Sequence, residues 1–245
     1  MGSTDLSSIK VLLVTKACGY RHACIPSMIS AFDSFPFTVK ATEDTSDLLS
    51  LSQFDVVALG HNTGEFLTDE EVDALSSFVE NGGGVVGIHA ATSGMSTNAK
   101  YTRILGEVFN GHPPPQWMVL MPESHGHYIH DLPSFPSPES IPASASEPPI
   151  TLLMGLPSKY LLWFDEVYTF KSNGSDIRLA KDRVILLSVQ GGVGHESICT
   201  PLSWTQDVGK GRVYYTALGH FEEAYRDPWF LGYLRRAIVW TAKRE

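Results

Sequence analysis

The chain has 245 residues, of which 43% are apolar, and this is enough to bury the core of one α/β domain. Its net charge is -9, and its 18 lysines and arginines are spread along the sequence, which argues against a nucleic-acid-binding surface. The expected partner is therefore a small molecule, and neither nucleic acid nor a membrane. The sequence does not decide between a monomer and a homo-oligomer.

Location is indicated by what the sequence lacks. The opening residues have neither the basic nor the apolar region of a secretory signal, and no apolar run approaches the roughly 18 residues of a membrane span. Cys18, Cys24 and Cys199 form no Cys-x-x-Cys pair, and an odd number of cysteines fits reduced thiols better than a disulfide framework. We therefore expect a cytoplasmic protein.

The first half of the chain alternates apolar strands with helices. Thr68 to Glu71 predict a helix start, because the Thr68 hydroxyl and the Glu71 side chain form a capping box. Short loops between successive strand and helix pairs imply a parallel sheet with right-handed crossovers. The expected strands cover residues 9–15, 37–41, 54–60 and 85–88, and the expected helices cover residues 22–32, 45–51, 69–80 and 101–109.

The pattern changes after residue 109. Three consecutive prolines at 113–115 and the Pro- and Ser-rich residues 131–149 predict surface loops, the second of them an insertion. Regular structure then resumes, with strands expected over 184–189, 202–205 and 212–219 and a core-facing helix over 229–243. The sequence has no internal repeat. It predicts a single α/β domain over 1–245, with a flavodoxin-like, open, mostly parallel sheet and helices on both faces.

His89 stands at the most informative turn of the sequence. It directly follows the buried strand 85–88, and Gly87, Ala90 and Ala91 around it are small. Small residues permit the sharp turn by which hydrolases and amidotransferases expose a nucleophile at the carboxyl edge of an open sheet. Here the side chain at that turn is an imidazole in place of Ser or Cys.

Other histidines also follow predicted strands. His22, His61 and His220 come after the first, third and last of them, so they share a sheet edge with the histidine of the turn. His112 and the pair Asp165 and Glu166 lie in the part of the chain that must fold back over this edge. Each residue alone has a structural interpretation, as a helix start, a loop hydrogen bond or a rigid corner. Their coincidence at one edge favours a functional site.

Three further features have simpler interpretations. His125, His127 and His130 lie beside the Pro- and Ser-rich stretch without a hydrophobic frame, and we interpret them as a solvated loop. Gly191–Gly194 lacks a following helix, so a flexible turn is favoured over a phosphate-binding loop. Cys18 is a lone loop thiol, which is more often incidental than nucleophilic.

Five segments, in order, resemble the ThuA-like family, named for trehalose utilisation. The order and spacing match over nearly the whole chain. The resemblance implies a fold similar to class I glutamine amidotransferases, with histidine where those enzymes keep their cysteine, so amidotransferase activity is not expected. The segments are Gly19-Tyr20-Arg21-His22, Gly83 to Ala91, Gly111-His112-Pro113, Asp165-Glu166-Val167-Tyr168 and Gly211 to His220.

The resemblance also implies the site. Its catalytic, pocket-lining residues are His22, His89, His112, Glu166 and His220. Tyr20, Asp165 and Tyr168 are expected to bind the substrate beside them. Members of the family are associated with disaccharide and keto-sugar metabolism. This chain departs from the pattern in its insertion and at Val167, where a tryptophan is usual, and both changes are expected near the pocket mouth.

The leading hypothesis is an enzyme acting on a sugar, keto-sugar or similar polyhydroxylated small molecule. His89 and Glu166 serve as acid and base, because imidazole both takes and gives a proton near neutral pH. His22, His112 or His220 supply hydrogen bonds to the developing enolate. The reaction is then an isomerisation, an elimination or a hydrolysis, which makes the protein an isomerase, a lyase or a hydrolase.

Three alternatives are left open by the sequence. The same histidines and carboxylate suit Zn²⁺ with an open position for a hydrolytic water, although no local motif such as His-Glu-x-x-His is present. The scaffold also suits a small-molecule-binding module without turnover. A tailoring enzyme of secondary metabolism is the remaining hypothesis.

Overall fold

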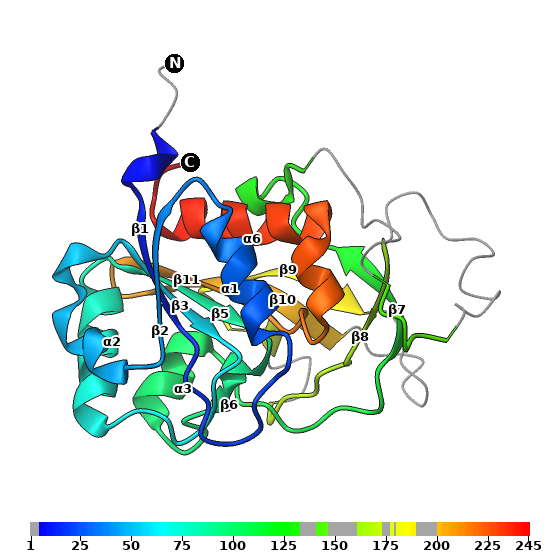
Figure 1. The fold of residues 1–245 in the computed structure, drawn as a ribbon, viewed down its shortest axis with the longest axis horizontal. Coiled ribbons are helices and arrows are strands. Elements are labelled where there is room, and N and C mark those ends of the chain that lie inside the picture. The colour runs from blue at the N-terminus through cyan, green and yellow to red at the C-terminus, as the bar shows by residue number, and fades with distance from the viewer. Residues whose placement is uncertain (1–4, 133–140, 147–160, 173–176, 179, 190–199) are drawn as a thin grey trace.

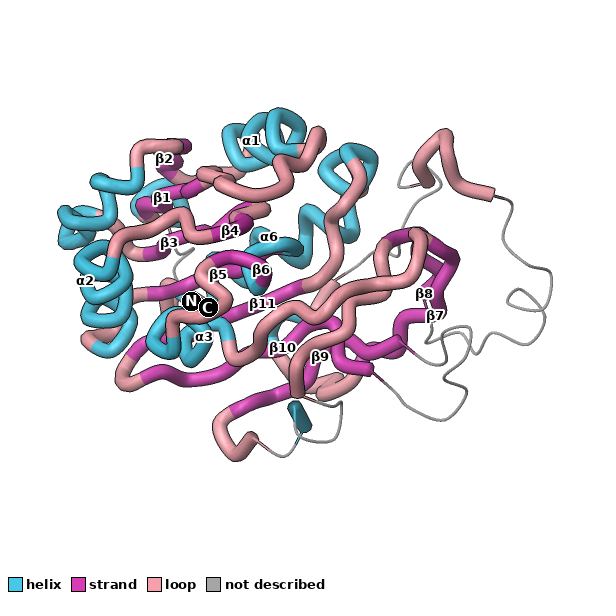
Figure 2. Tube along the Cα trace, turned by 90° about the horizontal axis from the view of Figure 1, so that it is seen from below, coloured by secondary structure: helices cyan, strands magenta, loops and turns pink. Residues whose placement is uncertain are grey.

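The computed structural model describes residues 5–132, 141–146, 161–172, 177–178, 180–189 and 200–245. The strands of its main sheet are β1 Lys10–Val14, β2 Thr38–Thr42, β3 Val56–Gly60, β5 Gly84–Ile88, β7 Gln116–Pro122, β8 Leu161–Asp165, β9 Arg183–Val189, β10 Thr200–Val208 and β11 Gly211–Thr216. Two short strands, β4 Thr63–Gly64 and β6 Ser93–Gly94, pair separately. Within the described residues the main sheet has the order β2-β1-β3-β5-β11-β10-β9-β7-β8 (Figure 2).

The sheet is mixed, and its parallel part forms the predicted open α/β core. Strands β2, β1, β3, β5 and β11 are all parallel to their neighbours in this part. The tight turn at Gly209, whose φ is 61°, reverses the chain from β10 into β11, and β10, β9, β7 and β8 continue the sheet as antiparallel strands. The strands β7 and β8 lie outside all predicted elements.

Helices cover both faces of the sheet, as predicted. The helices α1 and α6 lie over one face, and α2 and α3 pack together on the other (Figure 1). In the described part of the chain, five 3₁₀ segments accompany these four α-helices. The bounds are α1 Ile25–Asp33, α2 Asp69–Glu80, α3 Ala99–Leu105 and α6 Pro228–Thr241, with η1 Leu6–Ser8, η2 Thr45–Gln53, η3 His89–Thr92, η4 Tyr128–His130 and η6 Glu222–Arg226.

Local chemistry explains where the helices begin and end. The predicted capping box of α2 is present, since Thr68 and Glu71 bond to each other's backbone N–H groups. The helix α1 begins at Ile25, three residues later than predicted, because Pro26 favours the first turn of a helix. His22 therefore stays in the preceding loop. The helix α3 ends before Gly106, which adopts φ 91°.

The central strands are continuous apolar runs in the sequence because they lie in the core. All five residues of β3 and of β5 are buried, because both faces of these strands are covered. Most of the predicted insertion, Gly191–Gly194 and Cys199 lie outside the described residues. No helix in the described ranges is long and apolar enough to cross a membrane.

The interpretation of His125, His127 and His130 as a solvated loop is correct only for His125, which is exposed. His127 accepts a hydrogen bond from the backbone of η4 and packs against Trp240 of α6. The ring of His130 hydrogen-bonds the hydroxyl of Tyr233, also on α6. The helix supplies a hydrophobic frame that lies about a hundred residues away in sequence, which is why local reasoning missed it.

Replacement of His130 should change how stability depends on pH. Burial disfavours the imidazolium and lowers the pKa of His130 from 6.5 to about 4. The unfolded chain therefore binds more protons between these values, and stability is lost as the pH falls through this range. His130→Asn should flatten the acid slope by up to about 1.4 kcal/mol per pH unit in urea unfolding curves. His125→Asn is the control. An unchanged slope in His130→Asn contradicts the assignment.

Candidate functional site

Four imidazoles meet at the carboxyl edge of the parallel strands. His22, His61, His89 and His220 follow β1, β3, β5 and β11 in turn. Ring centroids are 4.7 Å apart for His22 and His61, 4.9 Å for His22 and His89, and 5.3 Å for His89 and His220. The strand-end positions identified in the sequence therefore lie together in space.

The turn at His89 has the predicted sharpness but a different exposure. His89 has φ 52°, in the left-handed region that costs a non-glycine residue about 1–2 kcal/mol. The Tyr215 hydroxyl donates to its carbonyl oxygen at 2.8 Å and helps to hold this conformation. The His89 side chain is fully buried, so the turn aims it at neighbouring side chains and not into solvent.

The tautomer of His89 follows from its partners. Its Nδ1 lies 2.6 Å from the carbonyl oxygen of Ala217, which can only accept, so Nδ1 carries a hydrogen. Its Nε2 is 2.8 Å from the Tyr168 hydroxyl and 3.3 Å from Nδ1 of His220. The second nitrogen of His89 is thus directed at the group of functional side chains.

Glu166 joins three of the imidazoles. Its Oε2 lies 3.3 Å from Nε2 of His89, and its Oε1 lies 3.4 Å from Nε2 of His112 and 3.3 Å from Nδ1 of His220. Burial alone would raise the pKa of Glu166, but the hydrogen bonds and charges of His220 and His89 outweigh it and hold this pKa well below its usual range.

The pKa of His220 moves in the complementary direction. Burial lowers it, but the hydrogen bond to Glu166 and the charges of Glu166 and Asp165 raise it more, so the net pKa lies above 6.5. Glu166 and His220 therefore favour the carboxylate and imidazolium forms together. His22 differs, because burial and then the charges of His89 and His220 lower its pKa to about 3.

Asp165 lies behind the site and is 1% exposed. Its oxygens accept from the Trp163 indole at 3.0 Å and from the backbone N–H groups of Glu166 at 2.9 Å, Gly219 at 2.8 Å and His220 at 3.3 Å. These bonds tie the end of β8 to the turn after β11. Asp165, expected to bind the substrate, therefore positions Glu166 and His220 instead of contacting the cavity.

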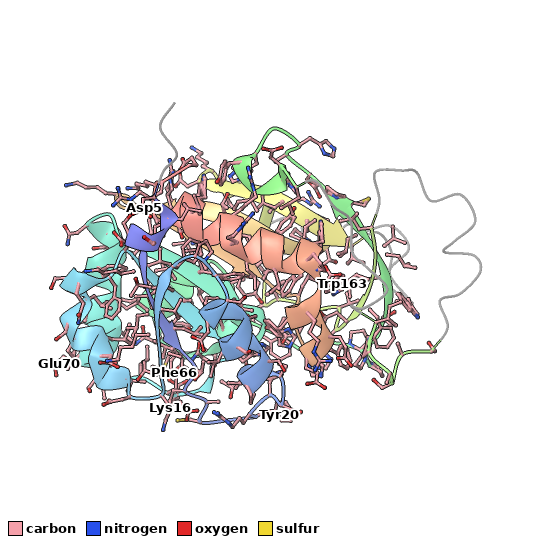
Figure 3. The ribbon with its side chains drawn as sticks, turned by 45° about the horizontal axis from the view of Figure 1, so that its top comes forward. Asp5, Lys16, Tyr20, Phe66, Glu70 and Trp163 are labelled. Carbon is pink, nitrogen blue, oxygen red and sulfur yellow. The ribbon has the colours of Figure 1, made fainter. Side chains whose placement is uncertain are left out.

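A cavity of about 460 Å³ opens beside Glu166. Six predicted site residues line it: Tyr20, His22, His112, Glu166, Tyr168 and His220. Tyr20 is 67% exposed and lies at the outer end of the loop that follows β1 (Figure 3). His89 and Asp165 are not among the lining residues.

One wall of the cavity is aromatic. The rings of Phe109 and Tyr168 have centroids 4.4 Å apart, and His112 stacks on Tyr168 at 5.8 Å with 21° between planes. Phe109 was not identified in the sequence, because it is the last residue of a predicted helix and does not follow a strand. Val167 is buried and does not line the cavity, so this departure from the family pattern lies away from the mouth.

A second hollow of about 510 Å³ adjoins the first. The two share Tyr20, His22 and His220, and Glu222 and Glu223 add carboxylates to the lining of the second hollow. The imidazoles therefore stand between an aromatic space and an acidic one.

His61 was noticed at the sheet edge but belonged to no predicted site. It is fully buried, and its Nε2 lies 2.6 Å from the Tyr225 hydroxyl and 3.4 Å from the Cys24 sulfur. Burial raises the pKa of the Cys24 thiol to about 12, so this thiol is not an activated nucleophile. The exposed Cys18 does not line the cavity.

One group of metal-ligating type stands out in the described part of the chain. Single ligand atoms of His22, His89 and His220 all lie within 4.8 Å of one another. Nδ1 of His22 is buried and has no hydrogen-bond partner among the described residues.

The fold and the site define an α/β protein of glutamine amidotransferase-like architecture with an imidazole at the nucleophile turn. The model of the ThuA family, described as trehalose utilisation, matches residues 10–241. The chain belongs to this family. No curated protein matches the chain.

Solved structures share the fold at low sequence identity. A ThuA-like protein from Bacteroides uniformis is 20% identical with a TM-score of 0.71, over 98% of this chain and 94% of its own. A ThuA-like protein from Parabacteroides merdae is 22% identical with a TM-score of 0.68, over 96% and 90%. A protein assigned to GMP synthase from Thermoplasma acidophilum is 11% identical with a TM-score of 0.55, over 96% and 95%.

Asp165→Asn should destabilise the protein. The amide of the new side chain lacks the negative charge, and its NH₂ group faces N–H donors that now hydrogen-bond the carboxylate. The loss in the free energy of unfolding should be roughly 2–4 kcal/mol. Urea unfolding measures the loss, with Asp207→Asn at an exposed position of β10 as the control. A loss for Asp165→Asn no larger than for the control contradicts the positioning role.

Proposed function

We propose that the protein is an enzyme that moves protons on a sugar, a keto-sugar or a similar polyhydroxylated small molecule. The observation that carries this proposal is one buried carboxylate, Glu166, in contact with two imidazoles, His112 and His220, that face a single cavity. Carboxylate and imidazole in mutual contact are the groups that most often serve as general acids and bases.

Glu166 and His112 form the acid and base pair of this proposal. Both line the cavity, and 3.4 Å separates Oε1 of Glu166 from Nε2 of His112, so a proton passes between them by a small movement. One removes a proton beside a carbonyl or from a hydroxyl, and the other returns it. His89 contacts Glu166 but is fully buried, so we assign it a positioning role in place of the acid or base role expected from the sequence.

The remaining polar groups fit the charge that develops on the substrate. His22, His220 and Tyr168 line the same cavity as Glu166, where they stabilise a negative oxygen such as that of an enolate. Abstraction beside a carbonyl followed by isomerisation or elimination needs only these parts. Hydrolysis uses the same pair with water as the nucleophile.

The side chains that line the cavity indicate the class of substrate. Phe109 and Tyr168 present ring surfaces suited to the C–H faces of a sugar, and polar side chains, Glu166 among them, also line the cavity. Glu222, Glu223 and the net charge of -9 disfavour phosphorylated compounds. The family description, trehalose utilisation, supports a sugar. A cytoplasmic location is part of the proposal, supported by the free thiols of Cys18 and Cys24.

The first test is a thermal-shift panel of sugars and keto-sugars, followed by turnover assays on the compounds that stabilise the protein. Glu166→Gln should bind these compounds but lose about 10²–10⁴-fold in kcat, because the amide neither accepts nor returns a proton. His112→Ala should lose about 10²-fold or more. His125→Ala, at an exposed position, is the control.

Native kcat in Glu166→Gln contradicts the proposed chemistry. Compounds that bind the native protein but are never converted favour the hypothesis of a binding module instead.

A further inference from the structure

We infer that the imidazoles of His22, His89 and His220 bind one divalent transition-metal ion, with Zn²⁺ the best fit. The inference rests on the proposed function only for what the ion does, which is to polarise a substrate oxygen beside Glu166. The binding itself is argued from the donor atoms.

The spacing of two donors already matches a metal site. Zn²⁺ binds imidazole nitrogen at about 2.0–2.1 Å in tetrahedral geometry, which separates two ligand atoms by about 3.3 Å. Nε2 of His89 and Nδ1 of His220 are 3.3 Å apart. One ligand atom of His22 lies within 4.8 Å of those of His89 and His220, which places a third imidazole at the same point.

His22 provides an independent observation. Its side chain is only 6% exposed, and its buried Nδ1 has no hydrogen-bond partner within the described ranges. A buried polar atom without a partner is unfavourable in a native structure, and a bound cation is one way to satisfy it. No described residue has to give up a hydrogen bond to that nitrogen when it binds a cation.

The surroundings of His89 orient it as a ligand. Its Nδ1 donates to the carbonyl of Ala217 at 2.6 Å, the second contact that metal-binding histidines usually make, so Nε2 is the ligand atom. The Tyr168 hydroxyl, 2.8 Å from this Nε2, would have to give up its contact when the ion binds. His61 is also close, but it does not belong to the group whose ligand atoms all lie within 4.8 Å of one another, so it is not assigned to the set.

The nearby negative charge and the type of ligand atom indicate which ion is expected. Glu166 lies 3.3 Å from the ligand nitrogens of His89 and His220, and its negative charge offsets that of a cation. The ion would take the place of the proton between Glu166 and Nδ1 of His220, because a ligand nitrogen must be deprotonated. Asp165 adds a second buried carboxylate nearby. Three imidazoles favour Zn²⁺, Co²⁺, Ni²⁺ or Cu²⁺, whereas Mg²⁺ and Ca²⁺ prefer oxygen ligands.

The test uses the full chain without a histidine tag, stripped with a chelator. Calorimetric titration with Zn²⁺ should show one site, and Co²⁺ should give the visible absorption of a four-coordinate complex. His22→Ala and His220→Asn should each weaken Zn²⁺ binding by at least about 100-fold, since even residues behind the ligands contribute 10–100-fold. His112→Ala, which lines the same cavity, should bind Zn²⁺ normally.

Circular dichroism confirms that each variant is folded before titration. Absence of a stoichiometric site in the native chain overturns the inference, as does unchanged affinity in both His22→Ala and His220→Asn. If the native protein binds no Zn²⁺ and Glu166→Gln loses turnover, the metal site is wrong and the proposed function stands. Stoichiometric Zn²⁺ binding without conversion of any sugar supports the metal site and counts against the proposed function.

Discussion

The site depends on the burial of one carboxylate. Glu166 is 5% exposed, and a buried carboxylate is stable only when hydrogen bonds and positive charge replace the water that it loses. His89, His112 and His220 supply these contacts from three separate parts of the chain. Asp165 fixes the backbone of Glu166 and of the turn after β11, so the antiparallel strand β8 and the parallel strand β11 meet at one point. The site therefore combines residues from both halves of the sheet, because Glu166 follows the antiparallel strand β8 and His220 follows the parallel strand β11.

The parallel core and the sheet edge were predictable, and the reasons are physical. Strands such as β3 and β5, buried on both faces, produce continuous apolar runs, and residues directly after them must share an edge. The strands β7 and β8 were not predicted, because prolines border β7 and β8 follows a stretch without clear periodicity. The sequence placed His89 at the edge but not its burial, which depends on Tyr168 and Ala217 from distant segments. His130 shows the same limit, since Tyr233 of α6 contacts it from far along the chain.

The turn at His89 has the backbone of a nucleophile turn but not the side-chain exposure of one. Its sharp backbone and its position after β5 are those of a nucleophile turn, yet the imidazole points at Glu166 and His220 and is fully buried. A shared fold therefore explains where the site lies but not what it does. The chemistry has to be argued from the groups that face the cavity. Among these, Glu166 contacts several imidazoles, and His22 has a buried nitrogen without a hydrogen-bond partner in the described part of the chain.

A crystal structure of the protein with a bound sugar or keto-sugar tests the central claim most directly. The account predicts the ligand in the cavity between Tyr168 and His220, with an oxygen or the reacting C–H group within contact distance of the Glu166 carboxylate. A ligand bound at another surface, or one held in this cavity with its functional groups turned away from Glu166 and His112, would contradict it.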